Sequence, residues 1–415
     1  MEQWKEYKIS DIIEEIAMGP FGSNIKVDNF IDFGIPVLNG SNLQGFKLNE
    51  DSFNYVSEEK AESLGRANAF RGDVVITHRG TLGQIVYIPL DSKYERYVIS
   101  QSQFRLKLNQ DLIRPDFLVY FFHTRIGQHR ILMNASQVGV PALARPTSTF
   151  KEVSIPVPPM EIQNKIMSIL LSLNNKIEIN RRINDNLEQQ AQALFKSWFV
   201  DFEPFKDGKF VESEMGMIPE GWKYIKLGKL CESVSITHPQ KTGKLIFLNT
   251  GDIECGMVNK HNYMNINEMP GQAKKSIKEN DILYSEIRPC NKHYAFVNFS
   301  ADQYIVSTKL MVIRTYNNNS LRIYQFVTRK EIIDLLQHEA ESRSGTFPQI
   351  RFDNISDLDI LLATEPIEKQ YSHLISGIYN KIFKNELEIS KLQQLRDCIL
   401  PKLMSGELKI NDLNC

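Results

Sequence analysis

Apolar residues recur every three or four positions over residues 160–200, in the rhythm of a long amphipathic helix. Prolines end the preceding segment at Pro159, and Glu161 then falls in the first helical turn, where a carboxylate favours the positive end of the helix dipole. At 1.5 Å per residue, about 40 residues make a rod of roughly 60 Å. The predicted apolar seam comprises Ile162, Ile166, Ile169, Leu173, Ile177, Ile183, Leu187, Ala191, Leu194 and Trp198.

A second stripe of the same kind opens at Pro366 and predicts a second long helix. Pro401 is expected to kink or end this helix, and Gly406 to stop it. The seam residues are Tyr371, Leu374, Ile378, Ile382, Ile389, Leu392 and Ile399. Two such stripes bury most apolar surface against each other, although a helix of this type also packs on its own domain. If the helices run antiparallel, Asn180 and Asn385, which interrupt the seams, are expected to lie close together.

The two halves of the chain resemble each other. The segment 97–100 (Tyr-Val-Ile-Ser) returns as 304–307 (Tyr-Ile-Val-Ser), Pro141 returns as Pro348, and Glu161 returns as Glu368, each pair at the same spacing. One half is therefore a divergent copy of the other, and each copy ends in a long helix. We expect two unlike globular heads and two rods.

Each head is predicted to consist of short strands with few helices. In the first head, residues 72–77 and 84–88 are typical of a hairpin, and residues 115–134 are typical of a helix. In the second head the matching segments are strand-like residues 244–248 and 281–284 and a helical segment over residues 320–341. In both heads an arginine follows a predicted strand and lies in the next loop, Arg79 in the first head and Arg288 in the second.

The loops of both heads are rich in arginine, asparagine, glutamine and serine. Arginine pairs with guanine, and asparagine or glutamine with adenine, in the commonest forms of DNA readout. For any single residue an ordinary solvated side chain is the simpler explanation, but the recurrence at matching loops favours DNA contact. The candidate DNA-binding residues are Ser23, Asn24, Lys26, Asn39, Ser41, Asn42, His78, Arg79, Thr81, Gln137 and Arg145 in the first half, and Asn249, Thr250, Arg288, Asn291, Lys292, His293, Arg343 and Gln349 in the second.

Composition places limits on these readings. With 415 residues, 42% hydrophobic and 24% charged, the chain is long enough for two cores and ordinary for a soluble protein. The net charge is −1, so a polyanionic partner has to be met by local patches. The five cysteines never occur as CxxC, which favours free thiols over a zinc site, and residues 1–10 lack a signal-peptide core, so we expect a cytoplasmic protein.

Catalytic signatures do not appear in the sequence. Residues 40–45 have P-loop glycine spacing, but Phe46 stands where a lysine is required. Asp281 and Glu286 faintly resemble a nuclease carboxylate cluster, in which Arg288 replaces the customary lysine. We therefore predict that this chain is not an enzyme and holds no metal ion or cofactor of its own.

Two segments carry a family resemblance: residues 186–205 (NLEQQAQALFKSWFVDFEPF) and residues 395–408 (LRDCILPKLMSGEL). They are similar to segments of the specificity subunit of type I restriction-modification systems. The resemblance implies an α+β fold with two pseudo-repeat target-recognition domains separated by two long helices in an antiparallel coiled coil. The implied boundaries are 1–157 (first recognition domain), 158–200 (first spacer helix), 201–220 (linker), 221–365 (second recognition domain), 366–405 (second spacer helix) and 406–415 (tail).

The resemblance also implies partners. Each recognition domain would read one half of a bipartite site in double-stranded DNA, methyltransferase subunits carrying S-adenosylmethionine would clasp the helices, and ATP- and magnesium-dependent restriction and translocase subunits would join that core. A four-residue insertion in a rod should then change the length of the spacer between the half-sites. The alternative is a coiled-coil scaffold that binds no nucleic acid. Because Asn280 replaces Gly72 and the second head lacks a glycine loop like residues 19–23, use of the same loops by both heads stays open.

Overall fold

The computed structural model describes residues 4–133, 135–136, 139–259, 262–316, 319–343 and 348–408. Gln137 lies outside these ranges, and the side chains of Ser23 and Arg343 are outside the description as well. The chain forms two compact units, one of residues 1–177 with 391–415 and the other of residues 178–390. The division crosses both long helices, so each unit holds one head and one part of each helix.

The head of the first unit contains two four-stranded sheets. One sheet is antiparallel, in the order β2 (Ile13–Met18), β9 (Gln103–Leu108), β6 (Val74–Thr77) and β7 (Ile85–Tyr87). The other has the order β4 (Asn54–Val56), β3 (Ile35–Val37), β8 (Arg96–Val98) and β5 (Asn68–Phe70), with β3 and β8 parallel. β1 (Lys5–Lys8) pairs with β12 (Ser154–Val157), and β10 (Ala135–Ser136) with β11 (Ala142–Leu143). The hairpin predicted over residues 72–88 is confirmed as β6 and β7.

Short helices complete this head. They are α1 (Ile9–Ile12), α2 (Glu58–Ser63), α3 (Pro115–Phe122), α4 (Arg125–Leu132) and α5 (Pro146–Lys151). The single helix predicted over residues 115–134 is wrong in one respect, because the chain forms two helices there. The break comes at Thr124, whose hydroxyl oxygen accepts a hydrogen bond from the Gly127 amide at 3.1 Å and so caps the start of α4.

The head of the second unit repeats this plan strand for strand. Its antiparallel sheet has the order β16 (Cys231–Val234), β25 (Leu310–Thr315), β22 (Ile282–Ser285) and β23 (Tyr294–Phe296). Its second sheet has the order β20 (Tyr263–Asn265), β17 (Lys244–Leu248), β24 (Tyr304–Ser307) and β21 (Ala273–Ser276), with β17 and β24 parallel. The internal repeat predicted from the sequence is thus confirmed at the level of sheet topology.

Three two-stranded pairs and three short helices complete the second unit over its described residues. β15 (Lys223–Lys226) pairs with β26 (Asp359–Leu362), β13 (Phe210–Ser213) with β14 (Gly216–Pro219), and β18 (Ile253–Glu254) with β19 (Met257–Val258). The helices are α7 (Ser320–Val327), α8 (Lys330–Arg343) and α9 (Phe352–Ser356). As in the first head, the single predicted helix over residues 320–341 is two helices, α7 and α8.

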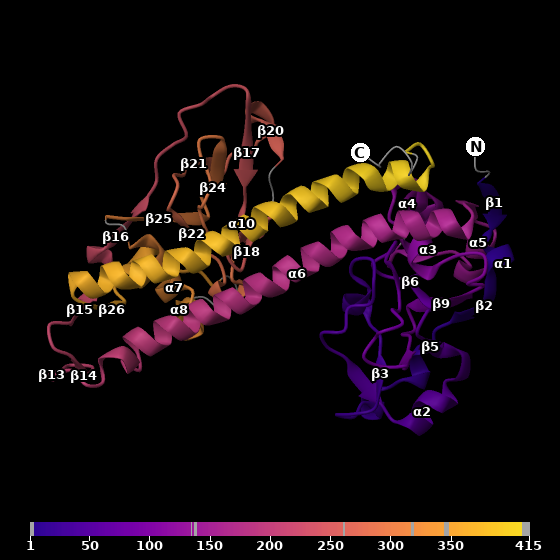
Figure 1. Cartoon of the computed structure of the whole chain (residues 1–415), viewed down its shortest axis with the longest axis horizontal. Helices are drawn as coiled ribbons and strands as arrows, with labels where there is room; N and C mark the ends of the chain where they lie inside the picture. The colour runs from indigo at the N-terminus through magenta and orange to yellow at the C-terminus, as the bar shows by residue number, and fades with distance from the viewer. Residues whose placement is uncertain are drawn as a thin grey trace. The chain divides into compact units, whose positions relative to one another are not determined.

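The two long helices are α6 (Met160–Phe199) and α10 (Glu365–Met404), and they pair antiparallel within each unit (Figure 1). In the first unit, Met167 near the start of α6 shares a core with Leu403 near the end of α10. In the second unit, Phe195 near the end of α6 packs against Tyr371 near the start of α10, with ring centroids 6.4 Å apart. The helices also pack on the head of each unit, because the same cores include residues of the antiparallel sheets.

The buried seam differs from the predicted one at two positions. Ile183 and Leu374 keep 37% and 43% of their surface exposed. The ordinary helical period of 3.6 residues drifts against a strict heptad, and on α10 the buried positions move to residues such as Ile375 and Tyr379. Of the other predicted seam residues, Ile162, Ile166, Ile177, Ala191, Trp198, Tyr371, Ile382 and Ile389 are buried, and Ile169, Leu173, Leu187, Leu194, Ile378, Leu392 and Ile399 are partly buried.

Both seam asparagines are buried, but they bond to neighbours instead of to each other. The Asn385 amide donates to Asn184 Oδ1 at 2.8 Å, and the Asn180 amide donates to Glu388 Oε2 at 2.9 Å. Asn180 and Asn184 are one helical turn apart on α6, and Asn385 and Glu388 are three residues apart on α10, so the two hydrogen bonds join neighbouring turns of the antiparallel pair.

The helix α10 ends near Gly406, as predicted, and it does not end at Pro401. Pro401 lies inside the last turn, the helix continues to Met404, and Gly406 then adopts a positive φ of 72°. Over the described ranges, no helix has an apolar stretch sufficient to cross a bilayer, and no group of His, Cys, Asp and Glu side chains has the geometry of a metal site. Cys231, Cys255, Cys290 and Cys398 are free thiols.

Candidate nucleic-acid interface

In the first head, the tip of the β6–β7 hairpin is held between two loops. The His78 amide donates to Ser102 O at 2.8 Å, and the Leu143 amide donates to His78 O at 2.8 Å. On the outer side of the tip the Gly80 amide donates to Pro141 O at 2.9 Å. These three backbone hydrogen bonds join segments that are distant in sequence and present them at one edge of the head.

The glycine loop at residues 19–24 joins the same edge. The Gly19 amide donates to Gln103 O at 2.8 Å, and a Cβ at Gly19 would lie 1.9 Å from Ser100 O, so only glycine fits there. The loop turns outward at Phe21, which is 83% exposed. Asn24 and Lys26, two of the predicted contacts, are also exposed in this segment.

The side chains at the tip differ in what they offer. Arg79 and Thr81 are exposed, as is Arg145 on the neighbouring loop. His78 is half-buried with its Nε2 3.1 Å from Gln101 O, and burial lowers the pKa of its imidazole. A neutral ring at neutral pH does not serve as a cation for phosphate, so the charge at this tip comes from the two arginines.

In the loop after β3, one of the predicted DNA contacts, Asn42, uses its side chain for hydrogen bonds within the protein. Asn42 is buried, and its amide donates to Asn49 O and Ser52 O, each at 3.0 Å, so its side chain is unavailable for DNA. Asn39 and Ser41 remain exposed. They lie beside the hairpin, because the Gln84 side chain donates to Gly40 O at 3.0 Å.

The second head builds the same edge with equivalent hydrogen bonds. The Glu286 amide donates to Lys309 O at 3.0 Å, the Ile350 amide to Glu286 O at 2.9 Å, and the Arg288 amide to Pro348 O at 3.1 Å. Glu286 therefore occupies the place of His78. It follows that Arg288 matches Gly80, and that the sequence-based matching of Arg288 with Arg79 is wrong by one residue.

Exposed polar and basic side chains surround this second tip. Arg288, Asn291, Lys292 and Gln349 are exposed, whereas Asn249 and Thr250 are partly buried. His293 is also partly buried, and its Nδ1 lies 2.7 Å from Ile253 O. The tip is anchored from behind, because the Cys290 amide donates to Gln337 Oε1 at 3.1 Å.

Sequence reasoning missed two residues at these edges. Arg351 is exposed at the N-cap of α9, where Arg145 stands at the N-cap of α5 in the first head. Matching through Pro141 and Pro348 pairs Arg145 with Phe352, so only the helix starts in the structure show that Arg351 and Arg145 stand at equivalent places. The exposed Phe21 was also not singled out, although its flanking glycines were.

The carboxylate that suggested a nuclease has a structural role. Asp281 is buried, and its two oxygens accept hydrogen bonds from Nε and Nη2 of Arg314, each at 2.7 Å. In the first head Asp73 lies 3.3 Å from Arg105 in a similar buried pair, and burial raises the pKa of Asp73 to about 6. Both acids are therefore paired with arginines inside the antiparallel sheets, and among the described residues no group of His, Cys, Asp and Glu could hold a metal ion.

The model of the type I restriction modification DNA specificity domain matches this chain twice, over residues 1–189 and 219–395. The chain belongs to this family. The two matches cover most of the chain, and each contains one head of this specificity-family protein.

Proteins of the same kind are similar to all or part of this chain. The specificity subunit of the type I restriction enzyme MjaIX from Methanocaldococcus jannaschii is 26% identical over 428 aligned positions, covering 99% of this chain and 95% of that protein. The HindI specificity subunit from Haemophilus influenzae is 36% identical over 43% of this chain and 39% of its own length. The crystal structure of the S subunit from M. genitalium shares the fold with a TM-score of 0.54, at 14% identity, over 97% of this chain and 96% of that one.

Proposed function

We propose that this chain is the DNA-recognition subunit of a type I restriction-modification complex, in which each head reads one half of a bipartite double-stranded site. The observation that supports this most directly is the repeated edge. Three equivalent backbone hydrogen bonds present a hairpin tip and a facing loop in both heads of a chain whose two halves both match the specificity family.

The exposed side chains of these edges suit DNA. Arg79, Arg145, Arg288 and Gln349 have the donors that read base edges in the major groove, and lysines such as Lys292 suit phosphate contacts. Together with these, the proposed DNA contacts are Ser23, Asn24, Lys26, Asn39, Ser41, Thr81, Gln137, Asn249, Thr250, Asn291, His293, Arg343 and Arg351. Asn42 and His78 are removed from the set because the fold uses their side chains.

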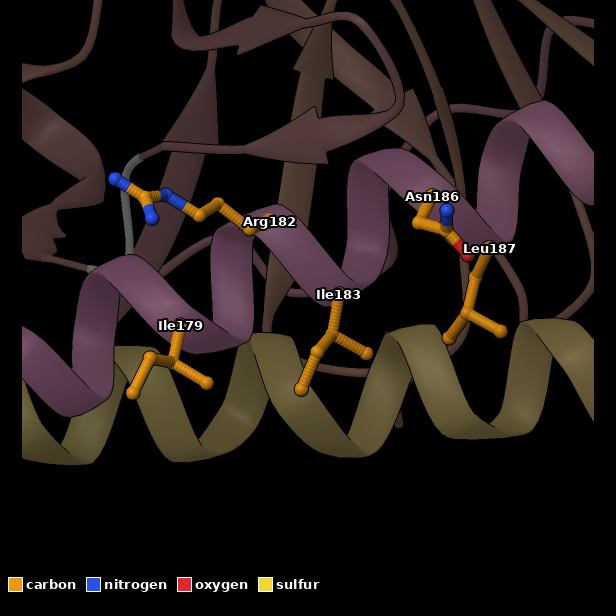
Figure 2. Close-up of a pocket in the computed structure, with 5 residues that line it drawn as sticks. All are labelled: Ile179, Arg182, Ile183, Asn186 and Leu187. Carbon is orange, nitrogen blue, oxygen red and sulfur yellow. The ribbon is translucent and has the colours of Figure 1, made fainter.

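The helix pair of the second unit offers a surface for a protein partner. Ile179, Ile183 and Leu187 line a hollow of about 270 Å³ on α6, together with Arg182 and Asn186. Figure 2 shows the three aliphatic side chains pointing toward α10, with Arg182 extending away. Ile179 and Ile183 are exposed, so an amphipathic helix of a methyltransferase subunit would cover apolar surface here.

In this proposal the chain contributes specificity and its partners contribute chemistry. S-adenosylmethionine would be bound by the methyltransferase subunits, and ATP with magnesium by the restriction and translocase subunits, in the cytoplasm. The recognition subunit would direct these activities to one sequence.

The test is a methylation map. The chain is co-expressed with the modification subunits of its system, and methylated adenines in the host DNA are located by sequencing. A bipartite motif with a constant spacer is expected, and it should vanish when this chain is omitted. Binding of the purified complex to a duplex carrying that motif should also weaken steeply with salt. A scaffold without nucleic-acid binding predicts neither result.

A further inference from the structure

Head 2 replaces two glycines of head 1 at positions where the backbone is left-handed. Gly72 (φ 88°) and Asn280 (φ 71°) are equivalent, since their amides donate to Ile88 O and Val297 O respectively, each at 2.8 Å. Gly80 (φ 90°) and Arg288 (φ 45°) are equivalent through their bonds to Pro141 and Pro348. The second head thus keeps the left-handed backbone of the first at both positions, although neither residue there is a glycine, which adopts this conformation freely.

The two replacements differ in physical cost. Asparagine visits the left-handed region routinely because its short polar side chain bonds locally, whereas arginine has no such compensation. Contacts inside the protein do not explain Arg288 either. Its side chain is exposed, and within the described ranges its guanidinium makes no ion pair and no contact with an aromatic ring.

The first head contains an arginine of the same kind on the facing loop. Arg145 has φ 45° and ψ 58°, and Arg288 has φ 45° and ψ 77°. Each is exposed, and each is followed by a proline, Pro146 or Pro289, that begins a short helical segment. Among the described residues, only six other than glycine have positive φ, and three of these, Arg145, Arg288 and Lys292, lie at the candidate interface.

The backbone groups of both arginines bond within the fold, but among the described residues neither guanidinium has an ion-pair partner, so the left-handed backbone points to a requirement for the position of the side chain. A phosphate contact does not need it, because a flexible cation on relaxed backbone reaches phosphates along the strand. Reading a base does need it, because two donors have to meet the O6 and N7 atoms of one guanine within a fraction of an ångström. The following proline further restricts the backbone at each arginine.

We propose that Arg145 and Arg288 are base-reading residues, each presenting its guanidinium to a guanine in the half-site of its own head. This inference rests on the proposed function. The two arginines stand on different segments of their heads, Arg145 on the loop before α5 and Arg288 at the β22–β23 tip. The two heads would then recognise different half-sites, each with an arginine on left-handed backbone followed by a proline.

The experiment compares Arg145→Gly, Arg288→Gly, Arg288→Lys and Asn280→Gly in the full chain. Asn280→Gly is the matched control, because it changes a left-handed residue of the same head without removing a cation. Each chain is purified for thermal unfolding and is also co-expressed with the modification subunits for methylation mapping.

Both Arg→Gly chains should unfold at the parent temperature or a few degrees above it, since glycine relieves the backbone strain. Each should lose preference for one G·C pair in one half-site by about tenfold or more, and the other half-site should keep its sequence. Arg288→Lys should relax the same position as Arg288→Gly, because lysine cannot make the paired contact. Asn280→Gly should leave the motif unchanged.

Three results would overturn the inference: an unchanged motif in the Arg→Gly chains, a uniform loss over all sequences that Arg288→Lys restores, or unfolding several degrees below the parent. A parent chain that directs no bipartite methylation would instead refute the proposed function itself, so the two failures are distinguishable.

Discussion

The side-chain amide of Asn385 on α10 donates a hydrogen bond to Asn184 Oδ1 on α6 at a distance of 2.8 Å, between the two long helices of the second unit. A buried polar pair of this kind costs stability relative to leucine but selects one register of two helices. One helical turn away, a second polar pair joins the two helices, in which the Asn180 amide donates to Glu388.

Removing this contact should weaken the helix pair. Asn385→Ala deletes the hydrogen bond and leaves a small cavity, so we expect a loss of about 1–2 kcal/mol in the free energy of unfolding, measured by denaturant titration. A double-mutant cycle with Asn184→Ala isolates the pair, and a coupling energy of zero would show that the two amides do not stabilise each other.

The second prediction concerns pH and the Glu386 carboxyl on α10. Burial, followed by the nearby carboxylate of Glu188, raises the pKa of Glu386 from 4.5 to about 7. Because this pKa is higher in the folded state than in the unfolded state, the contribution to stability is present below about pH 4.5 and is lost as the pH rises through 7. Ionisation of Glu386 therefore opposes folding at alkaline pH.

Glu386→Gln removes this titration. At pH 8 the variant should be more stable than the parent by on the order of 2 kcal/mol, and the difference should shrink toward zero near pH 5. Thermal unfolding at both pH values measures it, and the comparison between the two chains cancels other titrating groups such as Asp73. A constant difference at both pH values would contradict the assignment.

The third prediction concerns the buried ion pair that joins α7 to α10 in the second unit. Arg322 is 1% exposed, its Nη1 lies 2.7 Å from Glu368 Oε1, and its guanidinium lies 4.1 Å from the ring centroid of Phe199. Burial raises the pKa of Glu368. Arg322→Met leaves that buried carboxylate without a counter-charge, although the Ala363 amide still donates to it at 2.9 Å, and should cost about 3–5 kcal/mol in unfolding free energy.

The matched control for this pair is the double variant Arg322→Met with Glu368→Leu. Because no charge is then buried, it should recover most of the stability lost in the single variant, as measured by the same denaturant titration. A double variant as unstable as the single one would mean that packing of Arg322 on Phe199, and not charge pairing, dominates.

The fourth prediction concerns the tip of the first head. Arg79→Ala should reduce discrimination at one half-site by about 1–3 kcal/mol, because an exposed guanidinium is lost from the recognition edge. The methylated motif of the co-expressed system measures this. Arg125→Ala removes the same charge from α4 and serves as the control. Equal weakening of both half-sites by Arg79→Ala would mean a general phosphate contact.

The fifth prediction concerns the hollow on α6. Ile183→Asp introduces a charge on a partly exposed apolar surface, so the chain should fold but lose at least tenfold in affinity for its methyltransferase subunit, measured by calorimetry. Leu335→Asp on α8, also an exposed aliphatic position of the second unit, should bind normally. Equal affinity of the two variants would exclude the hollow as a docking surface.

The sequence by itself was sufficient for the features that depend on local order. The apolar rhythm predicted α6 and α10 with ends close to those found, and the hairpin of β6 and β7 and the internal repeat were also correct. These features follow from the helical period, from turn residues and from similarity along the chain, none of which requires knowledge of distant contacts.

Only the tertiary structure decided which side chains face the core and which face outward. Heptad counting selected Leu374 where Ile375 is buried, because the seam is set by the partner helix and the head together. Loop composition selected Asn42 as a DNA contact, but its amide donates to carbonyl groups seven and ten residues away. The matching of Arg288 with Gly80 depends on hydrogen bonds between loops about sixty residues apart in sequence, and such pairings are set by the energy of the whole fold and not by local pattern.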